Sequence, residues 1–155
     1  MFIVYILLIA LIPVLCEVIR YLVMQNTQTG SVTMIPYILD LSPAENRGVA
    51  FGLFQNSTVF FAVVTSVVII VMFIFLIKNY KNSKLFSVAA VLIIGGGAAN
   101  LFERVVYGYV FDYLQLSFFP PICNFADYCI TAGTVMLIVY LLFFYKDKEK
   151  KKIDE

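Results

Sequence analysis

The sequence predicts an all-α integral membrane protein with four transmembrane helices, a small β-structure outside the membrane, and an interfacial loop or helix segment. Hydrophobic residues make up 62% of the 155 residues, well above the share in a soluble domain. Four apolar runs are each long enough to cross a bilayer, which takes about 20 residues of helix. Because lipid offers the backbone no hydrogen-bond partner, these runs must be helices.

The four runs form one predicted membrane domain, residues 1–155. They lie at Phe2 to Met24, Thr58 to Ile77, Leu85 to Phe102 and Ala126 to Tyr145. The first run has no basic residues before it and no A-x-A-like cleavage site, so we expect a membrane anchor and not a cleaved signal peptide.

Most of the basic residues lie in two short segments that adjoin predicted spans. Of the eleven Lys and Arg residues, three lie in the short loop 78–84 and five in the tail 146–155. Basic residues favour the cytoplasmic side of a membrane, so both segments and both termini are expected in the cytoplasm. Loops 25–57 and 104–125 then face outward.

The two outward loops differ in composition. The first contains "GSVTMIPYILDLSPAENRGVAFGLF", where β-branched and aromatic residues alternate with Gly and Pro, as in short strands and turns. The second, "VVYGYVFDYLQLSFFPP", is amphiphilic and ends in two prolines. We expect this second segment to lie at the membrane interface and the chain to re-enter the membrane at Asn124.

Composition argues against several classes of function. The net charge is +1 and there is no His, so nothing indicates nucleic-acid binding or a His-based metal site, and we expect neither a metal nor a cofactor. The three cysteines, Cys16, Cys123 and Cys129, lack metal-ligand spacing and are most simply small buried residues. A bridge between Cys123 and Cys129 stays open.

Polar residues within spans are costly, and here they gather at the outward ends. Arg20 follows Glu17 by three residues, a helical spacing that allows an ion pair acting as a structural clamp. The third run ends in "GGGAANLFERVV", whose small residues favour close helix packing. Packing does not explain why Asn100, Glu103 and Arg104 share one helical face.

Three polar residues surround the start of the last run. Asn124 followed three residues later by Asp127 is typical of a capping box, which alone would account for both residues. Asp112 interrupts the apolar stretch 110–116 and has no such explanation. The alternative is an aspartic dyad, in which one carboxyl holds a proton while the other activates water for amide hydrolysis.

The ordered motifs "ENRGVAFG", "GGGAANLFERV", "GYVFDYL" and "NFADYCITAG" across four spans resemble those of the lipoprotein signal peptidases (signal peptidase II). The resemblance covers nearly the whole chain and implies that Asp112 and Asp127 are the catalytic aspartates. It further implies a set of residues that line or brace the site: Asn46, Gly48, Asn100, Arg104 and Asn124.

The same resemblance implies the biological setting. The family fold is a four-helix bundle with an extracytoplasmic β-cradle, in the bacterial cytoplasmic membrane. Its reaction cleaves a diacylglyceryl-modified prolipoprotein just before the lipidated cysteine, near the outer membrane face. The expected partners are therefore this substrate and membrane lipid, with no nucleic acid, and we expect a monomer.

The sequence also departs from the family pattern. Where the family has Asp-Gln-x-x-Lys, this chain has "CEVIR", with Cys16, Glu17 and Arg20 at those positions, and Glu103 stands where an aspartate is usual. One alternative is therefore a silent paralogue that binds lipopeptides without cleaving them. Another is a transport subunit that uses the acids as an ion pathway, although no span carries a charge near its centre.

Overall fold

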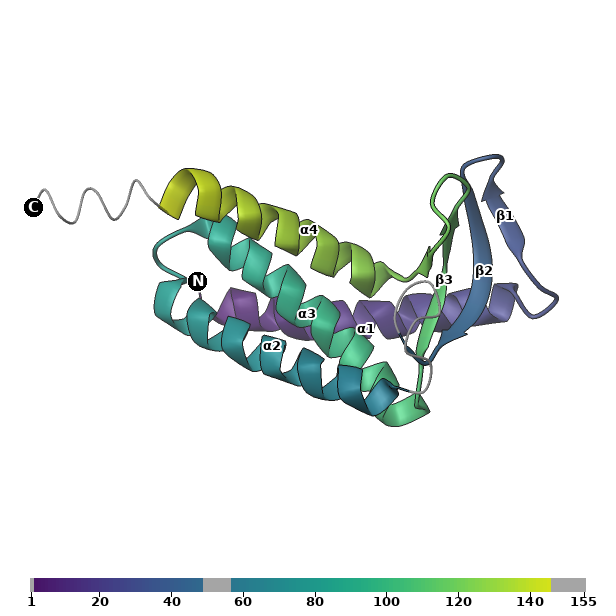
Figure 1. Cartoon of the computed structure of the whole chain (residues 1–155), viewed down its shortest axis with the longest axis horizontal. Coiled ribbons are helices and arrows are strands. Elements are labelled where there is room, and N and C mark those ends of the chain that lie inside the picture. Colours follow the sequence, from purple (N-terminus) through teal and green to yellow (C-terminus); the bar gives the residue numbers. More distant parts are fainter. Residues whose placement is uncertain (1, 49–56, 146–155) are drawn as a thin grey trace, which may run out of the picture.

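The computed structural model, which describes residues 2–48 and 57–145, confirms a helical bundle with a small antiparallel sheet at one end (Figure 1). The helices of this described part are α1 (Phe2–Asn26), α2 (Thr58–Asn79), α3 (Lys84–Tyr107) and α4 (Phe125–Tyr140), the last continuing as the π-helical turn η2 (Leu141–Tyr145). By length and composition, four segments among the described residues can cross a membrane, α4 and η2 counting as one. The basic tail 146–155 and the end of the "ENRGVAFG" motif lie outside the described residues.

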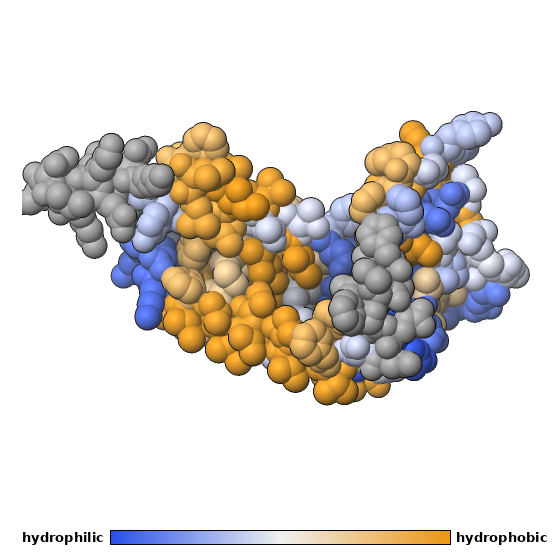
Figure 2. Space-filling model, viewed as in Figure 1, coloured by the Kyte–Doolittle hydropathy of each residue, from blue (hydrophilic) through white to orange (hydrophobic). Residues whose placement is uncertain are grey.

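Helix α3 is the centre of the bundle and contacts the other three helices. In the most apolar stretch of α3, 67% of the residues are buried. The corresponding share is 11% for α1 and for α2, and 17% for the segment formed by α4 and η2. The other helices therefore turn apolar side chains outward, and Figure 2 shows hydrophobic residues over most of this face of the helical part. Such a surface is stable in lipid and costly in water.

Two glycines let α3 and α4 approach closely. A Cβ atom added at Gly96 would lie 2.6 Å from the carbonyl oxygen of Ala126, and one added at Gly133 would lie 2.7 Å from that of Ala89. Both obstacles are backbone atoms, so the helices themselves would have to separate. The small-residue packing predicted from the "GGGAA" run is thus observed at Gly96.

Gly96→Ala and Gly133→Ala are each expected to lower the free energy of unfolding by about 1–3 kcal/mol, as overpacked cores do. Gly97→Ala is the matched control, because its nearest neighbour would be the side-chain atom Cγ1 of Ile69 at 3.3 Å. Thermal unfolding of the three purified variants in one detergent measures the difference. Equal midpoints for Gly96→Ala and Gly97→Ala would contradict the proposed close contact.

The sheet contains four antiparallel strands within the described residues, in the order β1 (Val32–Ile35), β2 (Leu39–Asn46), β3 (Val110–Leu116) and β4 (Ile122–Cys123). The first outward loop supplies β1 and β2, as its composition predicts. The second supplies β3 and β4, where we expected an interfacial loop or helix. The physical reason is long-range: β2 offers β3 a hydrogen-bonding partner, which the local sequence cannot reveal.

The alternation of side chains along β3 separates Asp112 from an apolar cluster. In β3, Phe111 and Tyr113 pack in an apolar cluster with Val23 of α1 and Leu41 of β2. Successive side chains on a strand point to opposite faces, so Asp112 between them points to the other face. The connection from α3 to β3 is short and begins at Gly108. This residue has φ 79°, a left-handed conformation typical of helix C-termini.

The described N-terminal end and the α2–α3 connection lie together at the end of the bundle opposite the sheet (Figure 1). Between the helical part and the sheet the surface is hollowed, and hydrophilic residues lie at the base of this hollow (Figure 2). The fold therefore brings a polar region against the end of an apolar bundle.

Candidate active site

Asp112 is a buried carboxyl held by two asparagine side chains. Only 3% of the residue is exposed. Asn46, at the end of β2, donates through Nδ2 to Asp112 Oδ2 at 2.8 Å, and Asn124 donates through Nδ2 to Asp112 Oδ1 at 2.9 Å. Both carboxyl oxygens thus accept an amide hydrogen.

Asp127 lies in the first turn of α4 and completes the predicted capping box. The Asp127 N–H donates to Asn124 Oδ1 at 3.0 Å, and the Asn124 N–H donates to Asp127 Oδ2 at 3.1 Å. The second oxygen of Asp127 accepts from Asn100 Nδ2 on α3 at 2.8 Å. The capping interpretation is confirmed. Capping does not account for the bond from Asn100, so Asp127 is able to have a second role.

Asn124 connects the two acids. Besides bonding Asp112 and capping Asp127, its Nδ2 donates to Asn100 Oδ1 at 3.0 Å. Its amide orientation is fixed, since Oδ1 accepts the N–H of Asp127. Asn46 is oriented in the same way, because its Oδ1 accepts the Gly48 N–H at 3.0 Å. Backbone donors therefore turn both amide nitrogens toward Asp112.

The environment of Asp112 favours its protonated form. Burial is the main cause, and it raises the pKa of Asp112 from 3.8 to about 7, with the nearby negative charge of Asp127 acting in the same direction. The hydrogen bonds from Asn46 and Asn124 oppose this shift but are outweighed. A carboxyl with such a pKa is able to hold a proton near neutral pH.

Arg104 lies on α3, one turn after Asn100, and its Nη1 donates to the Asn100 carbonyl oxygen at 3.3 Å. It lines a cleft of about 490 Å³ between the beginning of α2, at Thr58, and the end of α3. The guanidinium interacts electrostatically with both Asp112 and Asp127. Within the described residues no direct ion pair joins it to either acid.

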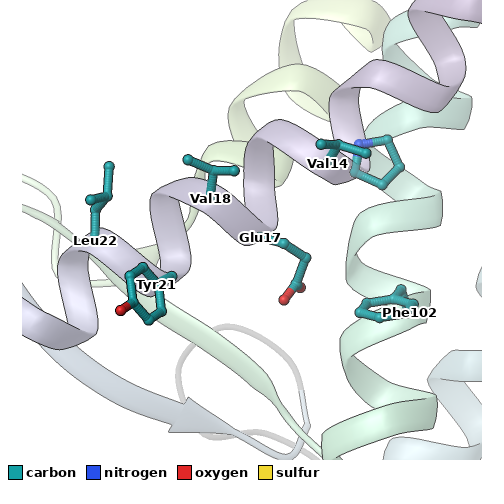
Figure 3. Close-up of a pocket in the computed structure, with 7 residues that line it drawn as sticks. Val14, Glu17, Val18, Tyr21, Leu22 and Phe102 are labelled. Carbon is teal, nitrogen blue, oxygen red and sulfur yellow. The ribbon is translucent and has the colours of Figure 1, made fainter.

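Glu17 and Arg20 contact the end of α3 and not the two aspartates. Arg20 Nη1 lies 3.8 Å from Glu17 Oε2, which also accepts the Tyr107 hydroxyl at 3.1 Å, and the guanidinium stacks 3.9 Å from the centre of the Tyr107 ring. Glu17 extends from α1 toward α3 into an apolar pocket of about 440 Å³ that also includes Phe102 (Figure 3).

Two polar contacts near the acids are ones that sequence reasoning missed. Glu103 Oε2 accepts the Phe111 N–H at 2.6 Å, and the Tyr113 hydroxyl accepts the Phe125 N–H at 3.3 Å. Glu103 could have been suspected from its position on the face of Asn100. Nothing in the sequence indicates the role of Tyr113, because strand pairing alone brings it to α4.

All three cysteines are free, so Cys123 and Cys129 are not bridged. Cys16 is 5% exposed and packs in the bundle core with Ala99, Ala126 and Cys129. It behaves as a small buried apolar residue, and its thiol makes no hydrogen bond to the aspartates among those described.

The fold and the two neighbouring carboxyls define a membrane-embedded protein with a polar site at one end of its spans, and comparisons identify its relatives. The family model for signal peptidase (SPase) II matches residues 8–143. A lipoprotein signal peptidase of Caldanaerobacter subterraneus subsp. tengcongensis is 42% identical over 114 residues, 74% of this chain and 78% of that protein. A lipoprotein signal peptidase of Enterococcus faecalis is 36% identical over 97% of this chain and 94% of that protein.

A solved structure is also similar. A bacterial membrane enzyme determined by the in meso method has a TM-score of 0.81 and 28% sequence identity, over 96% of this chain and 91% of that one. The chain belongs to the signal peptidase II family. It is therefore a peptidase, and family membership favours neither the silent paralogue nor the transport subunit.

Proposed function

We propose that the chain is an aspartic endopeptidase in which Asp112 and Asp127 are the catalytic pair. The observation that carries this proposal is the position of Asn124, whose side chain contacts Asp112 at 2.9 Å and the Asp127 N–H at 3.0 Å. One residue at a helix N-terminus thus contacts the carboxyl of Asp112 and the backbone of Asp127, two acids in different environments. Pairs of acids whose environments differ in this way divide acid and base roles between them.

Asp112 acts as the acid and Asp127 as the base. Asp127 removes a proton from a water molecule, whose oxygen attacks the scissile carbonyl carbon, while Asp112 donates its proton to the carbonyl oxygen. The proton held by Asp127 then passes to the leaving amine as the C–N bond breaks, and Asp112 recovers a proton from the diol. Asn46, Asn100 and Asn124 hold both carboxyls throughout, and Arg104 adds positive charge beside them.

The substrate is a prolipoprotein whose signal peptide is removed just before a lipid-modified cysteine. This rests on the relatives, which are named lipoprotein signal peptidases, and on the hollow between the apolar bundle and the sheet (Figure 2). A substrate held in the membrane by a signal helix and a diacylglyceryl group would present its scissile bond at this level. The lysines of the α2–α3 connection favour the cytoplasm, so the sheet and the site face the outer side of a bacterial cytoplasmic membrane.

A cleavage assay tests the proposal. The purified chain in detergent is mixed with a diacylglyceryl-modified prolipoprotein, and the shortened product is separated on a gel. Asp112→Asn should abolish the product band. Asp40→Asn is the matched control, because Asp40 lies in the same sheet but bonds Thr33 instead of an asparagine of the site. Product formation by Asp112→Asn at the parent rate would refute the assignment.

The rate should fall as the pH rises through about 7. The pKa of Asp112 is raised from 3.8 to about 7, so its proton stays bound between these values and is lost above the upper one. Since the acid must carry a proton, kcat/KM is expected to show an alkaline limb with a midpoint near pH 7. A profile that stays flat up to pH 9 would rule out Asp112 as the acid.

A further inference from the structure

Glu103 has a buried carboxyl group that the proposed chemistry does not use. It lies near the end of α3, one turn after Asn100, and is 4% exposed. Its Oε2 accepts the Phe111 N–H at 2.6 Å, and Phe111 directly precedes Asp112 in β3. The contact therefore holds the segment of backbone that carries the Asp112 side chain.

Within the described residues, Phe111 pairs with a neighbouring strand on one side only. On one side β2 pairs with β3, with Glu45 opposite Phe111. On the other side β4 is short and pairs only with Leu114 and Gln115. Glu103 supplies a side-chain acceptor for this strand residue, which β4 does not reach. A buried N–H without a partner costs about 1–3 kcal/mol, so the strand would shift or twist if this contact were lost.

The charged groups around Glu103 are engaged elsewhere. From α1, Arg20 pairs with Glu17 at 3.8 Å, and from α3, Arg104 donates to a backbone carbonyl. Cys16 from α1 and Asp127 from α4 are also near enough to interact with Glu103 electrostatically, and neither is a cation. Within the described residues the hydrogen bond of the Glu103 side chain goes to the Phe111 backbone. Its geometry is that of a brace for β3 and not of an ion pair.

We propose that Glu103 is a positioning residue for Asp112. By accepting the Phe111 N–H it holds the backbone of β3, and thereby the Asp112 carboxyl, in place beside Asn46 and Asn124. The inference rests on the proposed function, since it assumes that Asp112 takes part in the chemistry. Glu103 is 4% exposed, and its hydrogen bond goes to the Phe111 backbone and not to the carboxyl of Asp112 or Asp127. Its loss should therefore lower kcat and leave KM unchanged.

Three substitutions at position 103 separate the effect of side-chain length from the effect of the carboxyl charge. Glu103→Gln keeps the length and a carbonyl acceptor, Glu103→Asp withdraws the acceptor by one methylene, and Glu103→Leu removes it. All three are assayed with the parent chain and with Asp112→Asn, on one diacylglyceryl-modified prolipoprotein in detergent. We expect kcat of the Gln variant to stay within about threefold of the parent, and kcat of the Asp and Leu variants to fall by about 10- to 100-fold at constant KM.

Thermal unfolding of each variant identifies a merely structural role. If the Asp or Leu variant melts earlier but its folded fraction turns over at the parent rate, the inference is wrong. It is also wrong if Glu103→Gln loses as much kcat as Glu103→Leu, because the acceptor would then not be the active feature. If Leu does not fold, the contrast between Gln and Asp decides. Parent-rate turnover by Asp112→Asn would instead overturn the proposed function, and this inference with it.

Discussion

Asp112→Asn and Asp127→Asn are each expected to lower kcat for signal-peptide cleavage by about 10³- to 10⁴-fold, the range for removal of a general acid or base. An asparagine at position 112 has no acidic proton to donate, and one at position 127 cannot remove a proton from water. Neither change alters the apolar spans, so insertion into the membrane and the helical content should stay as in the parent. Single-turnover cleavage with excess enzyme measures the residual rate.

The double variant provides a sharper test of the shared chemistry. If Asp112 and Asp127 act as one unit, removing both should cost about as much as removing either one, because effects within a catalytic unit are strongly non-additive. Multiplied losses in the double variant would indicate that the two residues act in separate steps. Asp40→Asn, which changes an acid elsewhere in the sheet, should cleave at the parent rate.

The spans were predictable from the sequence because the membrane constrains a chain by composition alone. An apolar run such as Thr58 to Ile77 has few alternatives to a helix in lipid, and α2 is observed at Thr58–Asn79. The start of α4 was predictable for a local reason, since a cap and its partner are three residues apart. Asn124 and Asp127 form that box in the structure.

The strand at 110–116 was not predictable in the same way. Its residues include a continuous apolar stretch interrupted by Asp112, and an interfacial segment would have the same composition. What decides is the pairing with β2, which lies more than 60 residues earlier in the chain. Contacts of this kind depend on the fold as a whole, and no local pattern encodes them.

The polar residues of the candidate site were also only partly predictable from the sequence. Sequence reasoning collected its members by resemblance, but the bonds that orient them come from backbone groups far away in the chain. Asn46 reaches Asp112 across 66 positions, and the Gly48 N–H decides which way the Asn46 amide faces. Glu103 was noticed only as one member of a helical face, since its partner, the Phe111 N–H, belongs to a strand that was not foreseen.

Asn124→Ser is expected to separate the two tasks of Asn124, capping α4 and bridging the acids. A serine hydroxyl at an N-cap accepts the N–H three residues on, so the cap of α4 should remain and the free energy of unfolding should change by less than about 1 kcal/mol. The same serine has no amide nitrogen with which to bond both Asp112 and Asn100, as Asn124 does at 2.9 Å and 3.0 Å. Because Asp112 would lose one of its two donors, kcat should fall by about 10²-fold.

Asn124→Ala is the companion variant, since alanine removes the bridge and the cap together. Its kcat should match that of Asn124→Ser. Its free energy of unfolding should be lower than that of Asn124→Ser by about 1 kcal/mol, because the cap is lost. Measuring kcat and the thermal midpoint for both variants tests the two tasks independently. Parent-like turnover by Asn124→Ser would mean that the amide bridge between Asp112 and Asn100 is dispensable, and the cap would then be the whole role of this residue. A loss of turnover at an unchanged midpoint would instead show that the placement of Asp112 depends on this one amide.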